Sequence, residues 1–193
     1  LAKTQRKYDV VGFFDDVLNL DSIVENKPVL GRTTDIISLY NKGFFDYLIV
    51  GIGYKHLNFR EYIFQQYFGI IPFAILVFPY AYVDQTAILN DGVCIYAGAC
   101  IDKNVTIEYN VLVNLSVTIS HDSHIGAHSF IAPCVSIGGF TRAGTKNFLG
   151  INSTVIDNIK LTDDTIIGAG AVVIDNILEK GTFVGVPAKK IKL

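Results

Sequence analysis

Residues 119–137 read ISHDSHIGAHSFIAPCVSI, with isoleucine at every sixth position from 119 onward. Continuing the step of six in both directions reaches from Val83 to Val173. It finds valine, isoleucine or leucine at fifteen of sixteen positions, the exception being Ala143. This period matches neither an amphipathic helix, which repeats every ~3.6 residues, nor a flat strand, which repeats every ~2. It is typical of a solenoid in which short strands alternate with corners, three strands making one coil.

The repeat predicts a parallel β-helix over residues 81–193. The aliphatic residue of each hexad points inward, so any chemistry must lie on the outer surface of the coils. We take the left-handed sense from the known hexapeptide solenoids, because the general preference for right-handed crossovers predicts the opposite hand. We expect a last short cap at 174–180 and a tail from Gly181 to Leu193.

Residues 1–80 have a different pattern. The runs YDVVGFF at 8–14 and DYLIV at 46–50 are apolar and rich in β-forming residues, which predicts two buried strands. Two helices are predicted, one from Thr33 or Thr34 to Lys42 and one from Asn58 to about Tyr67, each followed by glycine. Strands that alternate with helices indicate a small parallel α/β domain.

Ligands of such domains bind beyond the carboxyl ends of the strands. Asp15 and Asp16 follow the first predicted strand, and the Gly51–Gly53 turn follows the second. These residues are therefore candidate ligand contacts, although ordinary polar loop residues would give the same pattern.

The composition excludes several classes of function. The formal net charge of −2 offers no general attraction to nucleic acid or to anionic lipid. The longest apolar stretch, from Gly69 to Val83, contains two prolines and falls short of the ~20 residues of a membrane helix. Three cysteines without metal-binding spacing and without a signal peptide indicate free thiols in a reducing compartment. We expect a cytoplasmic, soluble protein.

The densest group of ionisable side chains is the run SHDSH at 120–124, followed by His128. In the hexad frame, His121 and Asp122 follow an inward residue and face outward at a corner. An imidazole beside a carboxylate is a candidate general base, although a solvated surface pair has the same sequence. His121, His124, His128 and Cys134 are possible zinc ligands by type, but their corner positions scatter them, and we predict no metal.

Four motifs together resemble bacterial sugar-nucleotide acetyltransferases, a group that includes amino-sugar N-acetyltransferases of surface-glycan synthesis and relatives of the sialic acid O-acetyltransferases. They are HDSHIGAHSFIAPCVSIGG at 121–139, FLGINSTV at 148–155, IIGAGAVV at 166–173 and VGVPAKKI at 184–191. A small N-terminal α/β domain whose strand ends in Asp-Asp belongs to the same pattern. The resemblance therefore extends over nearly the whole chain.

The resemblance implies a homotrimer with acetyl-CoA in the groove between neighbouring prisms, and a Rossmann-like N-terminal domain over 1–80 that holds a sugar nucleotide. It implies transfer of the acetyl group to the amino group of a nucleotide-linked amino sugar. The matching positions are His121 as general base, Asp122 as its orienting acid, Gly139 at the thioester, Ile151 in the coenzyme groove, Asn114 near the sugar, and Asp15 and Asp16 at the base of the nucleotide. Gly51 is a further candidate substrate contact because of its position after the second predicted strand.

Two departures from the pattern leave alternatives open. Many relatives have a second histidine that contacts the acetyl group, and this chain has Phe130 there, which puts the acyl group in doubt. Relatives also begin with a glycine-rich strand-turn that we expect to lie before Leu1. An O-acetyltransferase acting on a sugar hydroxyl and a non-catalytic β-helix scaffold are the alternative functions.

Overall fold

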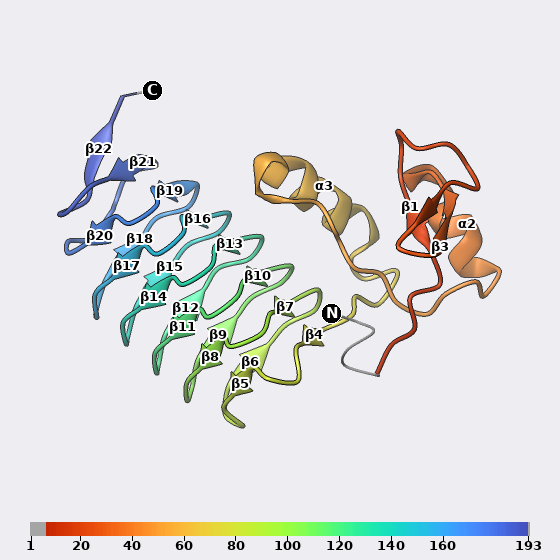
Figure 1. Cartoon of the computed structure of the whole chain (residues 1–193). Coiled ribbons are helices and arrows are strands. Elements are labelled where there is room, and N and C mark those ends of the chain that lie inside the picture. The colour runs from red at the N-terminus through yellow and green to blue at the C-terminus, as the bar shows by residue number, and fades with distance from the viewer. Residues whose placement is uncertain (1–6, 193) are drawn as a thin grey trace.

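The computed structural model describes residues 7–192, most of which form a long stack of coils (Figure 1). The stack has three faces, and on each face the strands of successive coils pair in parallel. The first face has eight strands: β4 (Leu76–Val77), β7 (Cys94–Ile95), β10 (Leu112–Val113), β13 (Phe130–Ile131), β16 (Phe148–Leu149), β19 (Thr165–Ile167), β21 (Gly181–Val184) and β22 (Lys189–Ile191). The second has six: β5 (Tyr82–Val83), β8 (Cys100–Ile101), β11 (Thr118–Ile119), β14 (Ser136–Ile137), β17 (Thr154–Val155) and β20 (Val172–Val173). The third has five: β6 (Ile88–Leu89), β9 (Thr106–Ile107), β12 (His124–Ile125), β15 (Arg142–Ala143) and β18 (Lys160–Leu161).

The strand register confirms the predicted repeat. Ile119 pairs with Ile101 on one side and with Ile137 on the other, so each strand stacks on the strand three hexads away. Every predicted inward residue from Ile95 to Val173 is at most 3% exposed. The parallel faces and the continuous aliphatic core fit a left-handed β-helix.

The corners also repeat every six residues. From Gly92 to Gly170, one residue of each hexad has a positive φ, between 54° and 78°. Glycine and asparagine tolerate this left-handed conformation best, which explains their frequency at these positions. We name three columns of corners. The His121 corner lies between the second and third faces, the α3 corner, named after helix α3 (Leu57–Tyr67), between the third and first, and the Asn114 corner between the first and second.

The N-terminal segment departs from the predicted parallel sheet. It has a three-stranded sheet in the order β1 (Phe13–Phe14), β3 (Lys27–Gly31), β2 (Ile23–Val24), in which β1 is parallel and β2 antiparallel to β3. The predicted strand at 46–50 is wrong, since Leu48 forms only an isolated bridge with Phe73. Phe45 and Val50 are buried in a cluster with residues of both helices, so their apolar character reflects packing and not strand pairing.

Both predicted helices are present. α2 (Ile36–Asn41) follows a 3-10 turn, η1 (Thr33–Asp35), and α3 (Leu57–Tyr67) follows η2 (Tyr54–His56). Gly43 and Gly69 lie just beyond the helix ends with φ of 75° and 80°, as glycines after helix termini commonly do. α3 runs along the flank of the coils (Figure 1).

The stacked strands extend beyond the predicted bounds of the solenoid at both ends. β4 already stacks on β7, so the coils begin before residue 81. The predicted tail from Gly181 is wrong up to residue 192: β21 pairs with β19 and turns back into β22, and Phe183 is buried by this pairing. Residues 1–6 and Leu193 lie outside the described part. Within residues 7–192, no helix has the length and apolarity needed to cross a membrane.

Candidate active site

His121 and Asp122 occupy the corner between β11 and β12, and they contact each other directly. His121 Nδ1 lies 2.9 Å from Asp122 Oδ2. The other carboxylate oxygen, Oδ1, accepts a hydrogen bond of 3.0 Å from the side-chain amide of Asn104, one coil earlier. Asp122 has a φ of 59°, so the corner conformation itself turns its carboxylate beside the imidazole.

The hydrogen bonds determine which imidazole nitrogen is free. The bonds from Asn104 and then from His121 lower the pKa of Asp122, so its carboxylate is charged and can only accept. In the neutral imidazole, His121 Nδ1 therefore carries the proton and Nε2 holds the lone pair. The His121 side chain is 40% exposed, which leaves this nitrogen accessible to a substrate.

Gly139 lies directly beneath the imidazole, one coil after His121. A Cβ atom on Gly139 would be 2.9 Å from His121 Cε1 and 3.0 Å from Nε2. Only glycine therefore leaves His121 in its observed place. Within residues 7–192, the Gly139 N–H donates no hydrogen bond, so it can serve an incoming oxygen.

Asn114 and Ile151 are not brought to His121 within one chain. Both lie on the Asn114 corner, across the whole second face from the His121 corner. Ile151 is 56% exposed, and the neighbouring Leu115 is 46% exposed. Asn114 Oδ1 accepts the N–H of Leu115 at 2.9 Å.

Phe130, which stands where many relatives have the second histidine, lies in strand β13 and not at a corner. It points outward from β13 but is only 8% exposed. The ring of Phe148 stacks beside it at 5.9 Å, and Tyr54 covers both rings at 5.5 and 4.9 Å. The N-terminal segment buries this position, which the solenoid repeat alone could not reveal.

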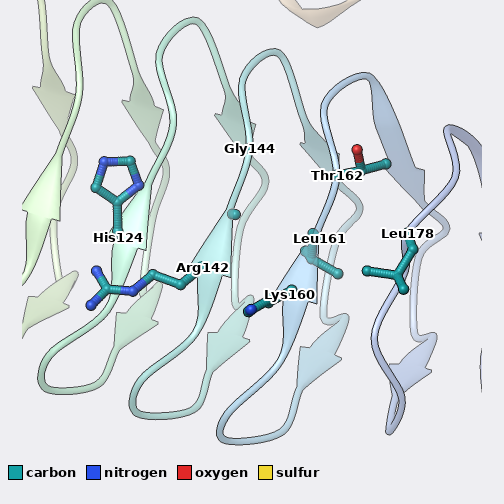
Figure 2. A pocket seen from close by; sticks show the side chains of 8 residues that line it. His124, Arg142, Gly144, Lys160, Leu161, Thr162 and Leu178 are labelled. Carbon is teal, nitrogen blue, oxygen red and sulfur yellow. The ribbon is translucent and has the colours of Figure 1, made fainter.

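The other two histidines of the cluster have separate surroundings. His124 lies on the third face, in a row with Arg142 and Lys160 (Figure 2). These three residues line a shallow pocket of about 380 Å³. His124 Nε2 is 3.1 Å from Glu108 Oε1. His128 is buried at the α3 corner. Among the described residues, no three histidine, cysteine or acidic side chains gather as metal ligands.

Asp15 and Asp16 follow β1 as predicted, but both carboxylates have partners within the turn. Asp15 Oδ1 accepts the N–H groups of Val17 and Leu18 at 2.8 Å, which lowers the pKa of Asp15. Asp16 binds the backbone and hydroxyl of Thr33 at 2.8 and 2.9 Å. Gly51 is exposed, with open space around it.

Sequence reasoning missed Asn104, the third member of the His121 cluster. It precedes Asp122 by one coil, and the pairing of β8 with β11 stacks the two corners. Counting back one coil from each candidate residue would have identified it.

No family model matches the sequence. Among curated proteins, the UDP-3-O-acylglucosamine N-acyltransferase of Bordetella pertussis is 37% identical over 68 residues, which is 35% of this chain and 19% of that protein. The enzyme of Delftia acidovorans is 31% identical over 67 residues, 35% of this chain and 20% of that protein. The chain thus spans about a fifth of the length of the curated relatives it matches.

Solved structures are similar over far more of the chain. The acetyltransferase domain of PglB from Neisseria gonorrhoeae has a TM-score of 0.91 and 26% identity, covering 99% of this chain and 91% of that one. A complex of the same domain with acetyl coenzyme A has a TM-score of 0.90, 27% identity and the same coverage. A variant of perosamine N-acetyltransferase from Caulobacter crescentus, with CoA and GDP-perosamine, has a TM-score of 0.88 and 26% identity over 94% of this chain and 84% of that one. The fold is that of the hexapeptide-repeat acetyltransferases.

Proposed function

We propose that this protein is an acetyl-CoA-dependent N-acetyltransferase that acts on the amino group of a nucleotide-linked amino sugar, in the synthesis of a bacterial surface glycan. The observation that carries the proposal is the His121 corner, where an ionised Asp122 fixes the imidazole and leaves Nε2 free above Gly139. The likeness to acetyltransferases crystallised with CoA, acetyl-CoA and GDP-perosamine supports the choice of substrates.

In this proposal His121 Nε2 accepts a proton from the amine as its nitrogen attacks the thioester carbonyl. Asp122 stabilises the imidazolium that forms. The Gly139 N–H binds the oxyanion that develops as the C–N bond forms. The oxyanion then collapses to the amide, the C–S bond breaks, and the coenzyme thiolate takes up the proton from the imidazolium, which restores the neutral base. Holding both substrates in line contributes several kcal/mol to lowering the barrier.

We propose a homotrimer in which the His121 corner of one copy meets the Asn114 corner of the next. Only this arrangement brings Asn114 and Ile151 to the base, because the second face separates them in one chain. The short side chains of Thr118, Ser136 and Thr154 point outward from that face and allow close packing. Sedimentation at micromolar concentration is expected to give a trimer, and a monomer would contradict the composite site.

The N-terminal segment is proposed to hold the nucleotide, with Asp15, Asp16 and Gly51 at its exposed edge. The experiment that tests the function is coenzyme release, followed with a thiol reagent, on UDP- and GDP-linked 4-amino sugars and their 4-hydroxyl counterparts. We expect release with an amino sugar. Release only with a hydroxyl sugar indicates an O-acetyltransferase, and release with none indicates a scaffold.

A further inference from the structure

Arg60 of α3 is completely buried, with 0% exposure, at the junction between the N-terminal segment and the coils. Its Nη1 donates to the carbonyls of Val50 and Ile52, at 2.7 and 3.0 Å. Its Nη2 donates to the carbonyl of Asn110, on the α3 corner, at 3.0 Å. One guanidinium therefore joins a loop, a helix and the solenoid.

This arrangement is not what stability alone would select. Burial lowers the pKa of Arg60, and no carboxylate within residues 7–192 forms an ion pair with it. Arg60 Nε and Asn110 Oδ1 are buried without a hydrogen-bond partner in the described part of the chain. Apolar side chains of similar volume often replace buried charges at no cost to stability, and unpaired buried polar atoms are unfavourable.

The loop that Arg60 fixes is the predicted substrate loop. The two carbonyls held by Nη1 flank Gly51 on either side. A Cβ on Gly51 or Gly53 would meet nothing within 4 Å, so the loop faces open space. Glycine-containing segments lose much conformational entropy on ordering, and a loop ordered beforehand binds its ligand more tightly.

We infer that Arg60 is the positioning residue of the sugar-nucleotide site, holding the loop Gly51–Tyr54 in its binding conformation before substrate arrives. The inference rests on the proposed function in assigning this loop to the sugar nucleotide. Tyr54, at the end of the loop, packs on Phe148 and Phe130, so the loop conformation also determines the aromatic surface over β13 and β16 on the first face.

The test compares Arg60→Met, Arg60→Lys and a control, Lys146→Met. Lys146 Nζ is 2.9 Å from Glu61 Oε2, so the control breaks a neighbouring contact of the same helix without touching the loop. With the amino-sugar nucleotide that the parent uses, Arg60→Met should raise KM for the sugar nucleotide roughly tenfold, the cost of ordering about one residue on binding. KM for acetyl-CoA should stay within about twofold. Arg60→Lys should give an intermediate KM, and Lys146→Met should match the parent.

Hydrogen exchange of the His56 amide, which donates to the Gly53 carbonyl at 3.2 Å, provides a second measurement that needs no turnover. It should be faster in Arg60→Met than in the parent and in Lys146→Met. Unchanged exchange and unchanged KM in Arg60→Met would overturn the inference. An equal rise in KM for the sugar nucleotide and for acetyl-CoA, together with a fall in stability, would overturn it too. If Arg60→Met does not fold, parental values in Arg60→Lys would overturn it. If the parent acetylates no sugar nucleotide, the proposed function fails, while exchange still decides whether Arg60 orders the loop.

Discussion

The His121 corner and the α3 corner come from the same stretch of sequence and have the same backbone, yet their histidines have opposite environments. Asp122 and His128 both take the positive φ of the repeat, 59° and 62°. His121 stands 40% exposed beside a charged carboxylate. His128 is 7% exposed, its ring 5.4 Å from that of Phe64, and its Nδ1 lies 3.1 Å from the Asn110 side-chain amide.

The difference shows that the repeat determines the backbone, while the element that covers a corner determines its chemistry. Helix α3 covers the α3 corner and excludes water, and this burial lowers the pKa of His128. The His121 ring contacts the edge of Phe140 at 5.1 Å, but no helix covers it in residues 7–192 and its side chain stays 40% exposed. Only an uncovered corner can exchange protons with a substrate.

The largest expected effect is on turnover at the uncovered corner. His121→Ala should lower kcat by roughly 10²–10⁴-fold with little change in KM, the usual range for removal of a general base. His124→Ala is the matched control. A control as inactive as His121→Ala would mean that the base is misassigned.

Substitutions of two adjacent glycines at that corner, Gly138 and Gly139, should affect stability and catalysis differently. A Cβ on Gly139 meets the exposed His121 ring, which can move aside, so Gly139→Ala should reduce kcat about tenfold or more with little change in Tm. A Cβ on Gly138 would be 2.4 Å from the backbone N of Asp157, which cannot move without disturbing the coil. Gly138→Ala should therefore lower Tm. Equal stability losses in both variants would contradict this division.

The cost of replacing Phe130 depends on the aromatic rings of Tyr54 and Phe148 that cover it. Phe130→His places a polar ring in a buried aromatic cluster, and we expect it to lower the free energy of unfolding by about 1–3 kcal/mol in urea denaturation. Phe140→His changes a phenylalanine that is half exposed on the His121 corner, and it should cost less than about 0.5 kcal/mol. Equal costs would mean that Tyr54 does not cover Phe130 in solution.

The sequence predicted the features that the hexapeptide repeat determines. It did not predict the contacts of the segments that cover the coils. Coil length, inward residues and the His121–Asp122 pair could be predicted because a period of six fixes both the register and the outward corner. The burial of Phe130 and His128 depends on α3 and Tyr54, whose contacts with the coils leave no periodic signal. The run at 46–50 misled for a related reason, since apolar residues are alike whether a helix or a strand partner buries them.

The smallest expected effect is a pH dependence of stability from the covered corner. Because burial lowers the pKa of His128 below its ordinary value of 6.5, the unfolded chain binds a proton below about pH 6.5 that the folded chain excludes. The free energy of unfolding should therefore fall as pH drops below that value, by no more than about 1.4 kcal/mol per pH unit from this group.

His128→Gln keeps an acceptor for Asn110 without a titrating proton, so the free energies of unfolding measured with urea at pH 7.5 and 5.5 should differ less in the variant than in the parent. His56→Gln, which removes an exposed histidine just before α3, is the matched control substitution. A parental pH dependence in His128→Gln would mean that water reaches this corner, and the contrast with His121 would then be lost.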